Sequence, residues 1–135
     1  MSSHLPRGIR NNNPGNIRHG DSWRGLAPGQ TDPDFCVFTS PEYGIRAMAR
    51  ILLNYQKKYG IRTIDGIISR WAPPSENNTK SYITAVSRAC QVAPTEIIDI
   101  AEYLPDIIPA IIQHENGMQP YDAATLQRGL ALALQ

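Results

Sequence analysis

The chain has 135 residues, of which 41% are hydrophobic and 19% are charged, and its formal net charge is +1. The length suits one domain with a buried core, and the hydrophobic content excludes a disordered chain. The near-neutral charge excludes a protein that mainly coats nucleic acid, and no apolar run is long enough to span a membrane. We therefore expect a single domain over residues 1–135, with nucleic acid not a partner and no insertion into a membrane.

The N-terminus and the cysteines bear on where the protein works. Residues 1–10 contain no apolar segment like that of a secretory signal peptide, so we expect synthesis in the cytoplasm without such a signal. Any action outside the cytoplasm then requires another means of delivery. Cys36 and Cys90 have no metal-ligand spacing, which predicts two reduced thiols in or near the core.

Residues 1–33 are rich in Asn, Gly and Pro, which favour turns rather than long regular elements. Apolar residues such as Ile9, Ile17 and Trp23 nevertheless recur through this stretch. The pattern predicts an ordered, irregular layer packed on the core, which we call the N-terminal wall. Residues 35–38 are the best candidate for a strand and predict one arm of a small β-hairpin.

From residue 40 onward the sequence is typical of helices. One long helix is predicted between Pro41 and Gly60. Ser40 is a suitable N-cap, Pro41 suits the first helical position, and Gly60 suits the position after the last helical residue. Further helices are expected at about 63–71, from about 79, at about 95–101, over the apolar stretch 104–117, and from a cap at Asp122 through Leu134. Leu134 is expected on the same side of the last helix as Leu126 and Leu130. The predicted fold is therefore mainly α, with about five to six short helices, a small β-hairpin and the N-terminal wall.

The most informative helix is the apolar one that ends at Asn116-Gly117. Its core-facing stripe, which includes Leu104, Ile108 and Ile111, ends in Glu115. A carboxyl group that is partly stripped of water there is expected to favour its protonated form, which is what a general acid requires. The alternative is an ordinary helix end whose glutamate turns out to solvent.

Other catalytic chemistries find less support. His114-Glu115 is not followed one turn later by a second histidine, because residue 118 is Met, so a zinc-protease helix is excluded. No Gly-x-Ser-x-Gly elbow and no phosphate-binding glycine loop is present. We therefore expect neither a metal nor a cofactor.

The remaining polar and aromatic residues suit a carbohydrate ligand. Sugar cleavage needs an acid for the leaving oxygen, and sugar binding uses flat apolar faces and amide groups. The alternatives are core packing for each aromatic residue and turn chemistry for the Asn-rich run. The candidate substrate-binding residues are Asn11, Asn12, Asn13, Asn16, Trp23, Tyr43, Trp71, Asn77, Tyr82, His114 and Tyr121.

Several motifs together resemble a family of phage virion-associated proteins. They are the runs at residues 7–18, 35–38, 43–47, 70–79 and 114–117, with a Trp-x-Gly at Trp23 and a tyrosine at Tyr82. The resemblance covers almost the whole chain. It implies a protein carried by a phage or prophage particle to the cell wall or periplasm, with other virion proteins as partners.

A second resemblance is to the lysozyme-like superfamily, especially its glucosaminidases and lytic transglycosylases. In these enzymes a catalytic glutamate ends a helix, and an Asn-rich wall, a strand and a helix that opens with Ser follow. Here the wall, strand and helix run in that order from Asn12 to Leu53, but the glutamate helix lies near the other terminus. The resemblance implies a circular permutation with Glu115 as the general acid. We then expect Glu115 within about 10 Å of residues 11–16.

A second catalytic carboxylate stays open among Asp21, Asp32, Asp34, Glu42 and Glu76, and lytic transglycosylases look able to work with one glutamate. The expected function is cleavage of peptidoglycan glycan strands by a muramidase, glucosaminidase or lytic transglycosylase that a phage particle carries. The alternative is a catalytically inactive, lysozyme-like virion protein that is structural or binds glycan.

Overall fold

The computed structural model describes residues 4–75 and 77–135. These residues form six helices and confirm the predicted mainly helical fold. The helices are α1 (Arg7–Arg10), α2 (Pro41–Tyr59), α3 (Ile64–Trp71), α4 (Thr79–Cys90), α5 (Ile100–Asn116) and α6 (Ala123–Ala133). None of the helices in this part of the chain has the length and apolar character needed to cross a membrane.

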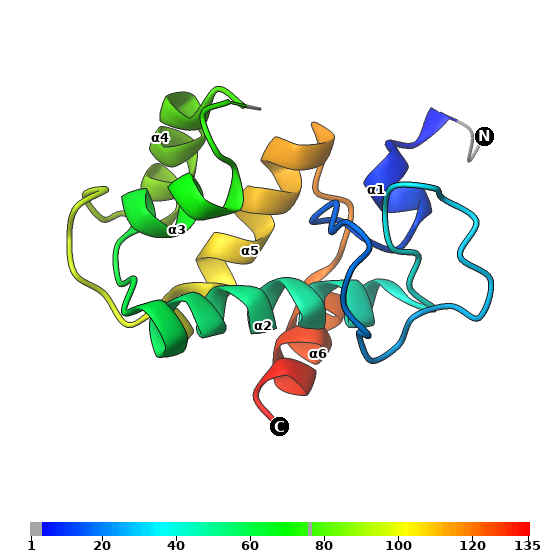
Figure 1. Cartoon of the computed structure of the whole chain (residues 1–135). Helices are drawn as coiled ribbons and strands as arrows, with labels where there is room; N and C mark the ends of the chain where they lie inside the picture. The colour runs from blue at the N-terminus through cyan, green and yellow to red at the C-terminus, as the bar shows by residue number, and fades with distance from the viewer. Residues whose placement is uncertain (1–3, 76) are drawn as a thin grey trace.

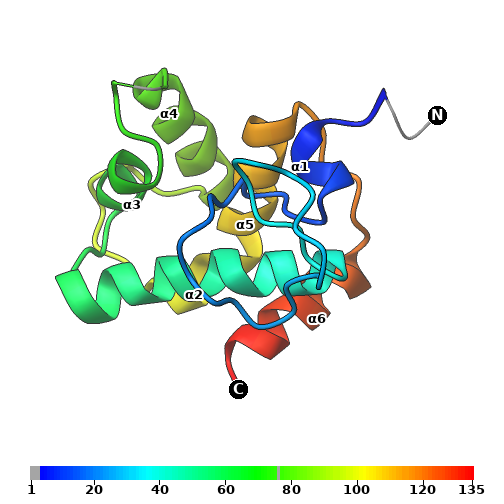
Figure 2. The ribbon, with the colours of Figure 1, turned by 45° about the vertical axis from the view of Figure 1, so that its right-hand side comes forward.

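The long helix α2 is the base on which the other elements are arranged (Figure 1). Helix α6 packs along α2, and the contact is close because Gly129 has no side chain; a Cβ atom there would lie 2.5 Å from Ile45 Cγ2. Helices α3 and α4 stand at one end of α2, and α1 with the N-terminal wall stands at the other (Figures 1 and 2). The C-terminal end of α5 lies between these two groups, so segments far apart in sequence meet there.

The ends of the helices follow the predicted capping signals. Gly60 ends α2 with φ of 68°, a left-handed conformation that favours glycine. The hydroxyl of Thr63 accepts a hydrogen bond from the backbone N–H of Gly66 at the start of α3. Asp122 caps α6 in the same way by accepting from the N–H of Thr125 at 2.8 Å. Local sequence was therefore sufficient to locate these three helix ends.

Helix α5 is the central element of the hydrophobic core. It packs chiefly against α4 and α2, and the burial of its apolar face is the main source of the fold's stability. The fully buried residues of that face are Ile100, Leu104, Ile107, Ile108, Ile111 and Ile112. The predicted apolar stripe of this helix is thus confirmed.

Two predictions for the helical part are wrong. Residues 95–99 do not form a helix, because the N–H of Ile98 bonds to the carbonyl of Arg62 at 2.9 Å and draws this segment into an irregular path. Ile98 is buried there, while Ile97 is 75% exposed. Leu134 lies beyond the end of α6 and is 62% exposed, so it does not join the packed face of that helix.

Residues 35–38 run between two parts of the N-terminal wall. Arg18 and Phe35 form one isolated antiparallel bridge, and Leu26 and Phe38 form another. No continuous strand is built from these bridges within residues 4–75 and 77–135, and the predicted β-hairpin is not confirmed. The wall also contains one helical turn, α1, where only irregular structure was expected.

Asn13 organises the N-terminal wall from inside. Its side chain is fully buried, and its Nδ2 donates to the carbonyls of Ile17 and Cys36 at 2.9 Å each. Its Oδ1 accepts from the N–H of Ile17 at 3.0 Å. Asn12 and Asn16 on either side adopt positive φ values of 53° and 52°, which asparagine tolerates better than most residues. The turn chemistry expected of this run is therefore present.

Candidate functional site

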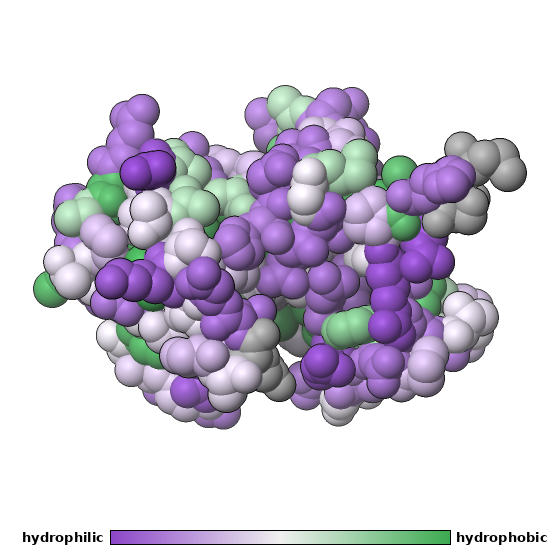
Figure 3. All heavy atoms as spheres, turned by 90° about the horizontal axis from the view of Figure 1, so that it is seen from above, coloured by the Kyte–Doolittle hydropathy of each residue, from purple (hydrophilic) through white to green (hydrophobic). Residues whose placement is uncertain are grey.

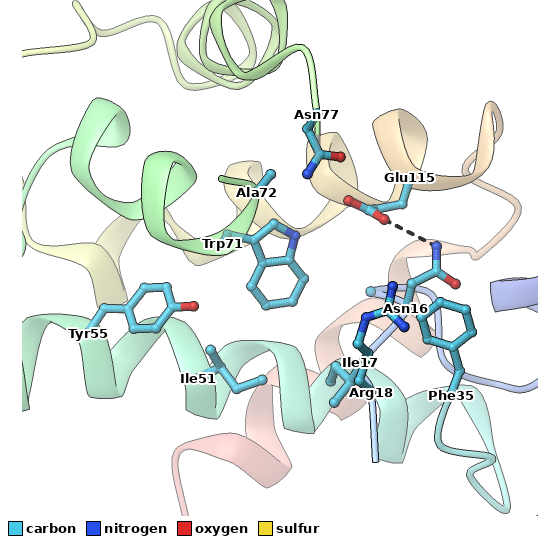
Figure 4. A pocket seen from close by; sticks show the side chains of 11 residues that line it. Asn16, Ile17, Arg18, Phe35, Ile51, Tyr55, Trp71, Ala72, Asn77 and Glu115 are labelled. Atoms are coloured by element: carbon cyan, nitrogen blue, oxygen red, sulfur yellow. Dashed lines mark hydrogen bonds between the residues drawn. The ribbon is translucent and has the colours of Figure 1, made fainter. Parts of the chain in front are cut away.

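Glu115 lies in the last turn of α5, at the edge of a cleft of about 480 Å³ (Figure 4). This volume falls within the range of small-molecule sites. The side chains that line the cleft come from the N-terminal wall, α2, α3, the loop before α4, and α5. They include Asn16, Arg18, Phe35, Ile51, Tyr55, Trp71, Asn77 and Glu115.

The carboxylate of Glu115 joins the two distant parts of the chain. Its Oε1 accepts a hydrogen bond from Nδ2 of Asn16 at 3.1 Å, and its Oε2 accepts one from the hydroxyl of Tyr82 at 2.8 Å. Nearby, Nδ2 of Asn116 donates to the carbonyl of Pro14 at 2.8 Å. The predicted proximity of Glu115 to residues 11–16 is therefore confirmed, although the catalytic role of Glu115 stays a prediction.

Tyr82 supports Glu115 from the interior. It is 1% exposed, and burial raises its pKa, as do the charge of Glu115 and the hydrogen bond to it. The phenol therefore remains a proton-bearing donor at neutral pH. The ring of the exposed residue His114 stacks on that of Tyr82 with centroids 3.8 Å apart. Both residues were predicted to bind substrate, and the structure places Tyr82 behind the carboxylate.

Aromatic side chains flank the cleft on two sides (Figure 4). Trp71 and Tyr55 lie on one side, and Phe35 and Arg18 lie on the other. The guanidinium groups of Arg7 and Arg18 both lie over the Phe35 ring, at 4.7 and 4.9 Å from its centroid. Because these guanidinium groups cover Phe35, the ring of Trp71 is the face that suits the apolar surface of a sugar, and the polar groups that line the cleft can bond its hydroxyls.

The structure brings four predicted residues into contact with the cleft or its carboxylate: Asn16, Trp71, Asn77 and Tyr82. Apart from Glu115, the sequence interpretation missed the other lining residues, among them Arg18, Phe35, Ile51 and Tyr55. Phe35 was assigned to a strand, and Tyr55 falls within the long helix predicted between Pro41 and Gly60. The sequence offered one signal, the spacing of Ile51 and Tyr55, which places them one helical turn apart on the same helix.

Three predicted asparagines use their amide groups within the wall. Asn11 donates to a carboxylate oxygen of Asp32 at 2.9 Å, and Asn12 donates to the carbonyl of Phe38 at 3.1 Å. Asn13 is fully buried. None of the three lines the cleft.

The three remaining predicted aromatic residues do not line the cleft. Tyr43 packs so closely against Gly25 that a Cβ atom there would clash with its ring. Tyr121 is half-buried, and its hydroxyl has no hydrogen-bond partner among the described residues. Trp23 lines a neighbouring hollow rather than the cleft itself.

The candidates for a second carboxylate are mostly held in ion pairs. Asp32 accepts from Nε of Arg7 at 2.6 Å, and this contact holds the pKa of Asp32 well below its usual range. Asp34 also pairs with Arg7, at 3.1 Å. Glu42 pairs with Arg128 at 3.0 Å. These pairs give each of the three carboxylates a structural role.

Two candidates remain outside these pairs. Asp21 lines the hollow next to the cleft, and Glu76 lies outside the described residues. Within residues 4–75 and 77–135, Glu115 is the one acidic residue that lines the cleft.

Metal and thiol chemistry has no preformed centre in the described part of the chain. No three His, Cys, Asp or Glu side chains there come close enough to share a metal ion. Cys36 and Cys90 are free, buried thiols, as predicted. Burial raises the pKa of both, that of Cys90 to about 11, so neither is a ready nucleophile at neutral pH.

Fold and site together define a small, mainly helical protein with a hydrogen-bonded glutamate at a polar and aromatic cleft. The chain is 42% identical over 127 residues to Protein P5 of Pseudoalteromonas phage PM2. The matching region covers 91% of this chain and 79% of the phage protein. It therefore belongs to the same family as that phage protein. No family model matches the chain.

Proposed function

We propose that this protein is a virion-associated enzyme that cleaves the glycan strands of peptidoglycan, with Glu115 as the general acid. The observation that carries the proposal is the placement of Glu115. It ends the most apolar helix, faces a cleft with aromatic walls, and is held by Asn16 and Tyr82. The proposal includes a lysozyme-like arrangement in which the glutamate helix has moved to the C-terminal side of the wall.

The chemistry begins with a proton. Glu115 donates its proton to the glycosidic oxygen, the bond between that oxygen and the anomeric carbon breaks, and positive charge develops on the sugar ring. Tyr82 and Asn16 then stabilise the carboxylate that is left, because each donates to one of its oxygens.

For the second step of the reaction, we propose the route of a lytic transglycosylase. The sugar's own 6-hydroxyl attacks the anomeric carbon and returns its proton to Glu115, so that one carboxyl acts first as acid and then as base. The site supports this route because Glu115 is the one acidic residue lining the cleft within the described residues. A muramidase or glucosaminidase route needs a water and, in most families, a second carboxylate.

Membership in a phage protein family supports delivery by a particle, with other virion proteins and peptidoglycan as partners. The alternative function is a catalytically inactive virion protein that is structural or binds glycan. One observation favours it: both oxygens of Glu115 already accept hydrogen bonds from protein groups, and such a carboxylate also serves as a structural link between α4, α5 and the wall.

The test compares the wild type with Glu115→Gln and with Glu102→Gln, an exposed glutamate on the same helix. Each protein is incubated with purified peptidoglycan, and the soluble fragments are analysed by mass spectrometry. We expect the wild type and Glu102→Gln to release anhydro-ended fragments, and Glu115→Gln to release at least about 100-fold less.

The other outcomes decide between the two functions. Equal release by Glu115→Gln removes this residue from the mechanism. Binding of peptidoglycan without release by any of the three proteins supports the alternative. Fragments with reducing ends in place of anhydro ends identify a hydrolase.

A further inference from the structure

A second hollow of about 500 Å³ adjoins the cleft at Glu115. The two share the side chains of Ile51 and Tyr55, which lie one turn apart on α2. Because they share these walls, a chain-like ligand bound at Glu115 can extend into the second hollow. In Figure 3 the molecule seen from above is mostly hydrophilic and is hollowed between the side of α3 and α4 and the side of the N-terminal wall.

The second hollow has a chemistry of its own. Two arginines, Arg50 and Arg70, line it together with a single acidic residue, Asp21. By contrast, the cleft at Glu115 has one arginine and one glutamate. The excess of positive charge in the second hollow is local, since the whole chain carries a net charge of only +1.

Both arginines are positioned by their surroundings. The guanidinium of Arg70 lies over the ring of Tyr59 at 3.9 Å from its centroid and over that of Tyr55 at 5.4 Å. Nη1 of Arg50 donates to the carbonyl of Ala133 at 3.1 Å, which leaves its other N–H groups available. Within residues 4–75 and 77–135, neither arginine forms a salt bridge.

A further arginine, Arg46, adds to the positive charge near Arg50. Arg46 precedes it by one turn of α2, and burial, followed by the charges of Arg24 and Arg50, lowers the pKa of Arg46. The Nε of Arg46 is buried and has no hydrogen-bond partner among the described residues. A cluster of like charges of this kind favours an anionic ligand, and the planar guanidinium matches a carboxylate by two parallel hydrogen bonds.

We propose that the second hollow binds the carboxylate-bearing peptide stems that peptidoglycan carries on its sugars, while the glycan strand lies in the cleft at Glu115. This proposal rests on the function proposed above. Arg50 and Arg70 pair with stem carboxylates, and Trp23 offers a face to the apolar parts of the stem. The ligand is then a strand with intact stems rather than bare glycan.

Binding is measured with the full chain carrying Glu115→Gln, so that strands remain uncut. Two ligands are compared: soluble glycan strands with intact stems, and the same strands after an amidase has removed the stems. We expect roughly tenfold tighter binding to the intact strands, the effect of one or two arginine–carboxylate pairs at a solvent-open site. The preference should shrink as salt is added, because exposed charges are screened.

Two further variants are made in the same background. Arg50→Gln with Arg70→Gln should lower binding to intact strands to the level of stripped strands and leave the stripped strands unaffected. Arg88→Gln, which removes an exposed arginine of α4 that lines neither hollow, should change neither value.

Equal affinity for the two ligands overturns the proposal, and so does an equal loss for both ligands in the double variant. Failure of the proposed function is seen in a different measurement, as no release of soluble fragments by the wild type. The ratio of the two dissociation constants does not depend on that release.

Discussion

Tyr82 is fully buried and Tyr121 has a buried hydroxyl, but the two hydroxyls have different surroundings. That of Tyr82 donates to Glu115 at 2.8 Å, whereas that of Tyr121 is buried without a partner among the described residues. Burial raises the pKa of Tyr121 to about 12. A buried hydroxyl without a hydrogen bond destabilises a fold, whereas a bonded one contributes to its stability.

Removing the two hydroxyls should therefore affect the free energy of unfolding differently. We expect Tyr82→Phe to lower the free energy of unfolding by about 1–2 kcal/mol, because Glu115 loses a donor. Tyr121→Phe should leave it unchanged or raise it by up to about 1 kcal/mol. Urea denaturation of the two variants and the wild type gives both values. A similar loss in both variants would contradict this view of the two hydroxyls.

Residues whose role depends on a distant partner were the hardest to predict from sequence. The spacing of α5 predicted Glu115 at the end of an apolar face, and the resemblance to lysozyme-like proteins predicted that the Asn-rich wall lies beside it. Nothing local indicated that Tyr82 would hold the carboxylate. The sequence explains Phe35 as part of a strand and Tyr55 as part of a helix, and neither explanation requires a binding site. Only the packing of α2 against the wall brings the two residues to one cleft.

At the scale of elements, the residue that ends α5 is a glycine, Gly117, two positions after Glu115. Gly117 has φ of 71°, and its N–H bonds to the carbonyl of Gln113 at 2.8 Å. A Cβ atom at Gly117 would meet no heavy atom within 4 Å. Any penalty for a side chain there thus comes from backbone conformation alone.

We expect Gly117→Ala to lower the free energy of unfolding by about 1 kcal/mol, because alanine resists the left-handed conformation. Gly29→Ala is the matched control: Gly29 also has no atom within 4 Å of a built Cβ, and its φ lies outside the left-handed range. Thermal melts followed by circular dichroism compare the two. An equal change in both would show that the left-handed cap is not the cause.

Elements with strong capping signals were predicted well, and elements defined by tertiary contacts were not. Helices α2, α3 and α6 begin or end at residues whose own side chain or backbone sets the boundary. Residues 95–99 lack such control, since the hydrogen bond of Ile98 to Arg62 decides their path. Residues 35–38 are likewise shared between two parts of the wall and do not pair with one partner strand.

On the scale of the whole molecule, the N-terminal wall is held partly by charge. Arg7 in α1 donates hydrogen bonds to Asp32 across the wall. This contact raises the pKa of Arg7 and lowers the pKa of Asp32. A folded pKa below the ordinary aspartate value of 3.8 means that protons bind more tightly to the unfolded chain. The contribution of Asp32 is therefore fully present above about pH 4 and is lost progressively below it.

We expect Asp32→Asn to flatten the decline of melting temperature below about pH 4, while it lowers the melting temperature at neutral pH. The measurement is a series of melts between about pH 2 and pH 7. Asp106→Asn, at an exposed position of α5, serves as the control and should retain the wild-type profile. Parallel curves for Asp32→Asn and the wild type would show that this ion pair does not contribute to acid lability.

The hydrogen bond between Asn16 and Glu115 joins residues 99 positions apart in the chain. Contacts of such long range form late in folding, because the entropy of closing a long loop opposes them until the rest of the chain is ordered. A growing polypeptide has the whole wall and α2 long before it has the end of α5. The cleft at Glu115 therefore cannot be assembled until almost the entire chain has been synthesised, and a truncated product lacks the site even where its first hundred residues fold.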